Sequence, residues 1–128
     1  MNLLLDTHTF LWFMAGNPSL SQAARSAIED ENNNLYLSVA SLWEIAIKVS
    51  IDKFELSEPF EILIPEQLAE NEIDLLNISV EHTALIVSMP FHHRDPFDRL
   101  IAAQAKTEQL TLVSVDTVFD AYGVNRLW

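Results

Sequence analysis

Four acidic residues stand where a fold could gather them into one polyanionic site: Asp6, Glu44, Asp98 and Asp116. Carboxylates held close together repel one another unless a cation neutralises them. Their hard oxygen ligands suit Mg²⁺ or Mn²⁺. One or two such ions lower the pKa of a bound water, orient it, and stabilise negative charge on a phosphate. The chemistry that this quartet predicts is metal-dependent hydrolysis of a phosphodiester bond.

Each of these acids also has a simpler structural explanation. Asp6 suits an Asx-turn after a strand, and Asp116 suits the cap of a short helical turn. Glu44 can pair with Lys48 one turn later, and Asp98 can favour a helix dipole from the first turn. Taken singly, each explanation suffices, so the argument for a site depends on whether the fold brings the four together.

Two of the acids follow predicted strands. The apolar run Asn2–Leu5 is typical of a strand buried on both faces, and Thr111–Val115 is rich in residues that favour strands. Asp6 and Asp116 come directly after these runs. Ligands of an open parallel sheet bind beyond the carboxyl ends of its strands. If the two strands are parallel neighbours, both carboxylates lie at the same edge.

Glu44 lies in a predicted helix that begins at Ser38 or Ser41 and runs to about Ile51. This helix is apolar nearly all round, and its polar residues Ser41, Glu44 and Lys48 fall at i, i+3 and i+7. That spacing puts them in one stripe. The pattern predicts a helix packed on most sides, with one face open to water or a cleft.

Asp98 lies in a predicted helix start within residues 92–99. Proline suits the first helical position, so Pro96 makes Asp95 the N-cap and places Asp98 in the first turn of a helix reaching about Glu108. One carboxylate is enough for capping. Asp98 is therefore left for the site.

Three basic residues lie within five positions of Glu44 or Asp98 and are candidate phosphate contacts, with ordinary salt bridges as an equal alternative: Lys48, Arg94 and Arg99. The histidines near the acids, His8, His92 and His93, lack the spacing of a zinc site, so we expect structural or solvent roles. Trp12, Trp43 and Trp128 are expected in the core, although an exposed one could stack on bases.

The whole chain reads as alternating strands and helices. Further helices are predicted after Thr7 as a cap, from Ser19 or Ser21, after Pro59 and from Ser79, with a helical turn over Thr117–Ala121. Further strands are predicted over Leu35–Val39, Ile73–Ile78 and Val124–Trp128. This alternation predicts the α/β class with a mainly parallel sheet.

The composition suits one globular domain over residues 1–128, with 49% apolar and 20% charged residues. The absence of cysteine excludes disulfides and thiolate metal sites. Neither a signal peptide nor a membrane span is apparent, so we expect a cytoplasmic protein without membrane contact. The net charge of −12 looks unfavourable for nucleic acid, but residues 52–81 hold nine acids against one lysine.

The chain resembles the PIN domain, and more narrowly the VapC-like toxins of bacterial type II toxin–antitoxin pairs. The resemblance covers essentially the whole chain and rests on four motifs in the same order, which are Leu3–His8, Ser38–Ile45, His93–Ala105 and Leu112–Asp116. It implies a three-layer α/β/α fold with a central, mainly parallel sheet of four or five strands. It also implies an Mg²⁺- or Mn²⁺-dependent ribonuclease that is a homodimer inhibited by a cognate antitoxin.

The acidic quartet of this family maps onto Asp6, Glu44, Asp98 and Asp116, with Asp6 and Asp98 as the firmest metal ligands. The resemblance also implies hydroxyl groups beside the site at Thr7 and Ser114, and Asp95 is a further candidate there.

Two alternative interpretations assign the chain to a different functional class. A phospho-accepting signalling domain also places aspartates at strand ends, but it needs a lysine late in the chain at the same edge. After residue 100 the basic residues are Lys106, in mid-helix, and Arg126, which makes that reading poor. A non-catalytic module with an acidic surface for a basic partner stays open, although all four carboxylates are present.

Overall fold

The protein is built from five short strands and six helices within the residues described by this computed structural model, 1–92 and 94–128. The strands are β1 (Asn2–Leu5), β2 (Asn34–Ser38), β3 (Ile73–Leu76), β4 (Thr111–Val113) and β5 (Arg126–Leu127). The helices are α1 (Thr7–Ala15), α2 (Gln22–Glu29), α3 (Val39–Ser50), α4 (Phe60–Glu70), α5 (Val80–Ser88) and α6 (Pro96–Thr107). A 3₁₀ helix, η1 (Thr117–Tyr122), precedes β5. None of the helices described is long and apolar enough to cross a membrane.

The strands form one sheet in the order β3-β2-β1-β4-β5, and every neighbouring pair is parallel. The sequence prediction of a mainly parallel α/β sheet with four or five strands is therefore confirmed. The strands β1 and β4 are direct neighbours, with Leu5 opposite Val113. The condition under which Asp6 and Asp116 share an edge is met.

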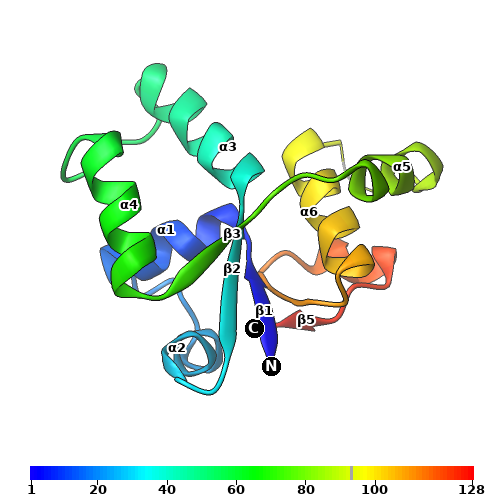
Figure 1. Cartoon of the computed structure of the whole chain (residues 1–128), viewed down its shortest axis with the longest axis horizontal. Helices are drawn as coiled ribbons and strands as arrows, with labels where there is room; N and C mark the ends of the chain where they lie inside the picture. Colours follow the sequence, from blue (N-terminus) through cyan, green and yellow to red (C-terminus); the bar gives the residue numbers. More distant parts are fainter. Residues whose placement is uncertain (93) are drawn as a thin grey trace.

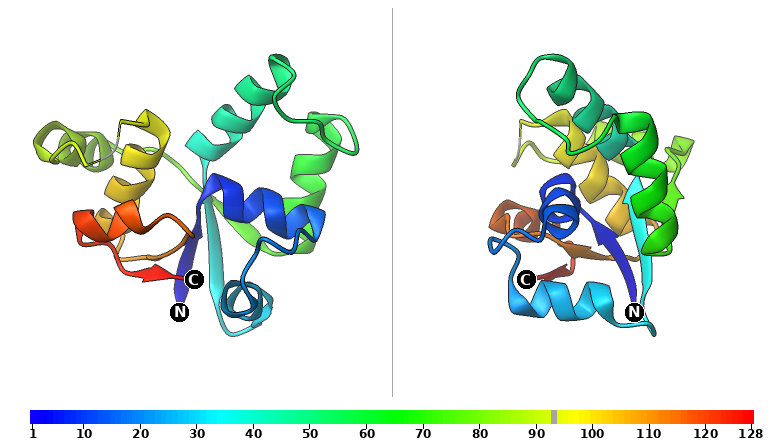
Figure 2. Two further views of the ribbon diagram at one scale, coloured as in Figure 1. Left: turned by 180° about the vertical axis from the view of Figure 1, so that it is seen from behind. Right: turned by 90° about the vertical axis from the view of Figure 1, so that its left-hand side faces the viewer.

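Helices cover both faces of the sheet and make three layers (Figures 1 and 2). Alternate residues of β1 pack on opposite faces of the sheet, because successive side chains of a strand point to opposite sides. Leu3 and Leu5 pack into a cluster with residues of α1 to α4. Leu4 packs into a second cluster formed mainly by α6 and η1. All three leucines are fully buried, as the continuous apolar run predicted.

The helix starts follow the sequence expectations, with one correction. Ser21, Ser38, Ser79 and Asp95 cap α2, α3, α5 and α6 through their side chains. At α1, however, the cap is Asp6 and not Thr7, since Asp6 Oδ1 accepts from Thr9 N at 2.8 Å. The helix α1 ends at Gly16, whose φ of 62° is the left-handed conformation that glycine adopts without strain.

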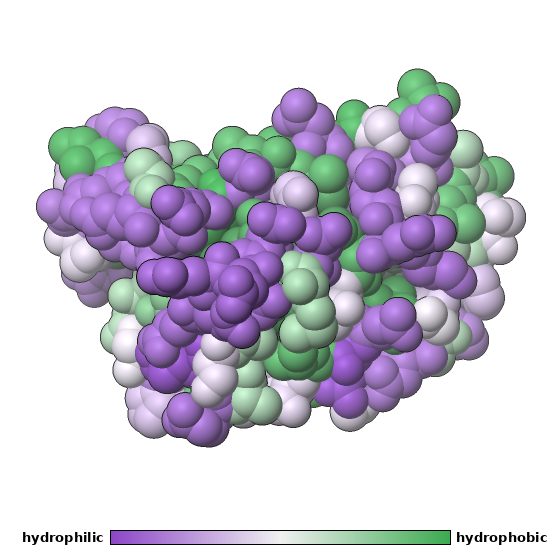
Figure 3. All heavy atoms as spheres, turned by 60° about the horizontal axis from the view of Figure 1, so that its bottom comes forward, coloured by the Kyte–Doolittle hydropathy of each residue, from purple (hydrophilic) through white to green (hydrophobic). Residues whose placement is uncertain are grey.

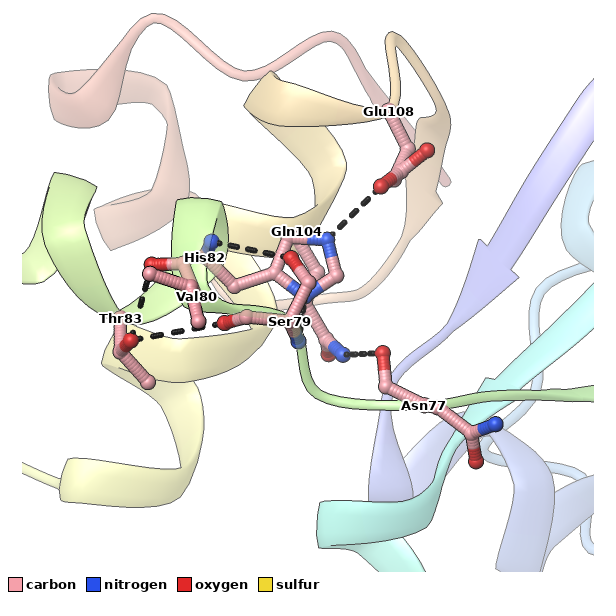
Figure 4. Close-up of polar contacts among 7 residues, drawn as sticks. All are labelled: Asn77, Ser79, Val80, His82, Thr83, Gln104 and Glu108. Carbon is pink, nitrogen blue, oxygen red and sulfur yellow. Dashed lines mark hydrogen bonds and ion pairs between the residues drawn. The ribbon is translucent and has the colours of Figure 1, made fainter.

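The helix α5 is fastened to α6 through a buried histidine (Figure 4). His82 Nδ1 accepts from Ser79 N at 3.0 Å, and His82 N donates to Ser79 Oγ at 3.2 Å, which is a reciprocal capping box. The other ring nitrogen lies 2.8 Å from Glu108 Oε1 at the end of α6. Because Nδ1 is an acceptor here, Nε2 must carry the hydrogen. This contact fastens α5 to the C-terminal end of α6.

Candidate active site

Asp6 occupies the point where β1 gives way to α1. Its side chain is 6% exposed and caps the helix with one oxygen, whereas a carboxylate offers about four acceptor positions. Its backbone N donates to the Val113 carbonyl at 3.2 Å, and Thr9 Oγ1 donates to the same carbonyl at 2.9 Å. These bonds tie the start of α1 to the end of β4. They fix Asp6 beside the loop that carries Asp116.

Glu44 is held next to Asp6 through a hydroxyl group. The Thr7 hydroxyl donates to Glu44 Oε1 at 2.6 Å and also lies 2.9 Å from Ser41 Oγ. Lys48 Nζ donates to the other oxygen of Glu44 at 3.0 Å. Glu44 is 4% exposed, so this ion pair is more than a surface contact and neutralises a buried charge. The predicted stripe on α3 therefore faces α1.

Asp98 lies in the first turn of α6. Asp95 caps this helix, because its Oδ1 accepts from Phe97 N at 2.9 Å and from Asp98 N at 3.3 Å. The helices α6 and α3 meet through their aromatic rings, with the centroids of Trp43 and Phe97 5.3 Å apart. Trp43 precedes Glu44, and Phe97 precedes Asp98. This contact brings the starts of the two acid-bearing helices together above the end of β1 (Figure 1).

Asp116 lies on a loop and not directly after the strand, because β4 ends at Val113, two residues earlier than predicted. Ser114 is fully buried, and its Oγ accepts from Asp116 N at 3.0 Å. Its carbonyl accepts from Arg126 Nη1 at 3.1 Å. Asp116 in turn caps η1 by accepting from Val118 N at 3.0 Å. Ser114 thus shapes the loop that presents Asp116.

Asp6 and Asp116 follow the neighbouring strands β1 and β4, Glu44 is bonded to Thr7 beside Asp6, and Asp98 lies in the first turn of a helix that packs on α3. Within residues 1–92 and 94–128, however, no three His, Asp or Glu side chains form a group that could hold a metal ion. The donor chemistry still fits Mg²⁺, which keeps several waters and takes only one or two carboxylates from a protein. Asp6 is more than nine-tenths buried, which makes a compensating cation favourable at this edge, whereas the charge of Glu44 is already paired with Lys48.

The three predicted phosphate contacts have different surroundings. Lys48 is paired with Glu44. Arg94 is exposed. Arg99 is 5% exposed, and its guanidinium donates to the carbonyls of Pro90 at 2.9 Å and Ile86 at 3.3 Å. It also lies 4.0 Å over the Phe91 ring. The expectation that Arg99 contacts phosphate is therefore not supported, because this side chain binds the end of α5.

The histidines and tryptophans also differ in their surroundings. His8 packs on Trp12 with ring centroids 5.7 Å apart, and His92 packs on Tyr122 at 5.1 Å, which fits structural roles. His93 lies outside the described residues. Trp12 and Trp128 lie partly buried against the core. Trp43 corrects the prediction that all three are core residues, since it is 64% exposed.

Much of the acidic excess lies away from the carboxylate quartet. Glu70, Glu72 and Asp74 line a cleft of about 860 Å³ at the amino ends of β2 and β3, together with acids of the segment after α2. Figure 3 brings the lower end of the molecule forward and shows hydrophilic side chains over much of that face. The net charge of −12 therefore overstates the repulsion at the opposite edge, where the quartet lies.

Comparisons with known proteins agree with this fold. The family model of the PIN domain matches residues 3–125. Ribonuclease VapC22 of Mycobacterium tuberculosis is 33% identical over 115 residues, which cover 89% of this chain and 86% of that protein. Ribonuclease VapC16 of the same organism is 33% identical over 60 residues, or 47% of this chain and 43% of that protein.

Solved structures with the same fold include a toxin–antitoxin complex from Klebsiella pneumoniae, which matches with a TM-score of 0.58 and 18% identity, covering 90% of this chain and 87% of that chain. The structure of VapBC2 from Rickettsia felis bound to a promoter DNA fragment matches with a TM-score of 0.74 and 18% identity, covering 100% of both chains. FitAcB from Neisseria gonorrhoeae matches with a TM-score of 0.65 and 21% identity, covering 97% of this chain and 95% of that chain. The fold, the family match and the relative of nearly equal length agree, and the chain belongs to the PIN domain family, within which it is VapC-like.

Proposed function

We propose that this protein is a divalent-metal-dependent endoribonuclease and the toxin of a toxin–antitoxin pair, acting in the cytoplasm. The proposal is supported by the PIN family match over residues 3–125 and by the positions of Asp6 and Asp116 after two neighbouring parallel strands, at the edge where ligands of parallel sheets bind. The name of the relative VapC22, a ribonuclease, supports RNA as the substrate.

Asp6 and Asp98 would be the first ligands of Mg²⁺ or Mn²⁺, with Glu44 and Asp116 completing the acidic site. The chemistry that a bound ion supplies here is activation of water and stabilisation of charge on the scissile phosphate. The chain's other residues position these acids. Thr7 and Lys48 orient Glu44, Ser114 shapes the loop of Asp116, and Asp95 fixes the helix start that carries Asp98. Arg94, which is exposed beside this helix start, is the retained candidate for a phosphate contact.

The proposal predicts that RNA cleavage by the purified, partner-free chain stops when EDTA is added and returns with excess Mg²⁺ or Mn²⁺. Gel analysis of a labelled RNA measures this directly. An Asp98→Asn chain purified in parallel is the control for contaminating nucleases. Cleavage that continues undiminished in EDTA would exclude the metal-dependent mechanism.

The toxin role predicts that expression of the chain alone arrests bacterial growth. Co-expression of its cognate antitoxin, expected to be a small protein encoded beside it, restores growth, because the antitoxin occupies the acidic edge. Growth curves and plating efficiency measure the effect. We also propose that the chain acts as a homodimer when it is free of the antitoxin. Normal growth on expression of an active nuclease would contradict the toxin role while leaving the nuclease role standing.

A further inference from the structure

Lys48 pairs with a carboxylate of the acidic site at which a divalent cation is proposed to bind. We propose that Lys48 supplies Glu44 with the positive charge that a second metal ion would otherwise supply, so that the acidic site binds one divalent ion and Glu44 is not one of its ligands. This inference rests on the proposed metal-dependent function and extends it to the number of ions and to a positioning residue.

Glu44 has a hydrogen-bond donor for each of its two oxygens. Thr7 Oγ1 donates to Oε1 at 2.6 Å, and Lys48 Nζ donates to Oε2 at 3.0 Å. Hydrogen bonds to an ionised carboxylate are stronger than those between neutral groups. A divalent ion bound to the same carboxylate would lie close to the ammonium group of Lys48, and the two positive charges would repel each other. Direct coordination by Glu44 is therefore disfavoured.

Lys48 is held in this position by more than the ion pair. Its Nζ lies 5.2 Å from the centroid of the Phe54 ring, which is within the range of a cation–π contact. The chain places that ring by turning back after α3, where the Lys48 carbonyl accepts from Lys53 N at 2.8 Å and from Phe54 N at 3.2 Å. The ammonium group is thus fixed between a carboxylate and an aromatic ring. Lys48 is therefore a fixed charge beside the acidic site rather than a mobile surface group.

The burial of Glu44 distinguishes this ion pair from a surface pair at the same helical spacing. The Glu44 side chain is 5% exposed, whereas that of Glu29, which pairs with Arg25, is 56% exposed. Water solvates an exposed acid whose partner is lost, but a carboxylate as buried as Glu44 needs a cation, which a lysine or a metal ion can provide. Lys48 already meets this need. Asp6, which is 6% exposed, is left as the buried acid that a metal ion would compensate.

Isothermal titration of the full, partner-free chain with Mn²⁺ tests this assignment, and the parent is expected to bind one ion per chain. Lys48→Met removes the charge and keeps much of the side-chain volume. This variant should bind a second Mn²⁺, or bind the first at least about tenfold more tightly, because either change compensates the charge released on Glu44. Lys53→Met is the matched control, since it removes the same charge from an exposed side chain shortly after α3, and it should bind Mn²⁺ like the parent.

A double variant that combines Lys48→Met with Glu44→Gln distinguishes a buried ion pair from a metal ligand. It replaces the ion pair by two neutral groups, which is often neutral for stability, and the glutamine oxygen can still accept from Thr7. If Glu44 is not a ligand, the double variant should bind one Mn²⁺ with a Kd within about threefold of the parent value. Urea unfolding checks that each chain is folded, and the double variant decides alone if Lys48→Met does not fold.

The inference is overturned if the parent binds two Mn²⁺ per chain, or if folded Lys48→Met shows neither the second ion nor the tighter binding. It is also overturned if Lys53→Met shows the same gain, because net charge alone then explains it, or if the double variant binds more weakly than its stated limit, because Glu44 is then a ligand. In each of these cases metal-dependent cleavage of RNA by the parent still stands. If the parent binds no Mn²⁺, the proposed metal-dependent function fails and this inference fails with it.

Discussion

Asp98→Asn is expected to reduce RNA cleavage by roughly three orders of magnitude, since a bound divalent ion contributes several kcal/mol to the transition state and each 1.36 kcal/mol is tenfold in rate. Asparagine keeps the shape of the side chain but removes the charge that would hold the ion. The loss of a first-turn carboxylate costs no more than about 1 kcal/mol of helix stability. Single-turnover cleavage rates and urea unfolding separate the two effects.

Asp95→Asn is the matched control for this experiment. Asp95 lies three residues away on the same helix start, and its Oδ1 accepts from two backbone N–H groups. Asparagine caps helices about as well as aspartate, so cleavage and stability should both be largely kept. Equal losses in the two variants would mean that the negative charge of the helix start matters as a whole, and that Asp98 has no separate role as a ligand.

The sequence predicted the layers of this fold well because local patterns determine them. The run Leu3–Leu5 reads as a strand buried on both faces, and all three side chains are fully buried. The end of β4 was predicted two residues too late for a non-local reason. Val115 favours a strand by residue type, yet the Ser114 carbonyl accepts from the side chain of Arg126, and Ser114 Oγ accepts from Asp116 N, so the chain turns into the loop of Asp116. Val115 is left 45% exposed.

The site was predicted correctly only where a local sequence pattern determines the position of a residue. The stripe of Ser41, Glu44 and Lys48 is a periodic signal, and the three residues share one face as predicted. That face packs on Thr7, with Ser41 and Glu44 buried, and does not open to water as the spacing indicated. Trp43 and Arg99 were misplaced because residue type alone suggests burial for tryptophan and exposure for arginine. Partners far along the chain decide otherwise. Arg99 is buried by the carbonyls that end α5, and no local pattern encodes that contact.

The buried position of Arg99 leads to the largest stability effect that we expect. Its guanidinium donates to the carbonyls of Ile86 and Met89, at 3.3 and 3.4 Å, and to that of Pro90 at 2.9 Å. The last carbonyls of a helix lack intrahelical donors, so a cation at this end also complements the dipole. The same side chain joins α6 to α5, which is otherwise fastened by His82 and Glu108 at the opposite end of α6. Removing it would take the guanidinium donor from the carbonyls of Met89 and Pro90 and open a cavity.

Arg99→Ala is accordingly expected to lower the free energy of unfolding by about 2–4 kcal/mol in urea titrations, because hydrogen bonds to charged groups contribute about 1.5–3 kcal/mol. Arg94→Ala, five residues earlier and exposed, should change it by less than about 0.5 kcal/mol. For RNA binding we expect the opposite order, with the larger effect in Arg94→Ala. Arg94→Ala should weaken binding and flatten its salt dependence, whereas Arg99→Ala, studied where it is folded, should bind normally. If Arg99→Ala and Arg94→Ala lowered the free energy of unfolding equally, the assignment of Arg99 to the end of α5 would be refuted.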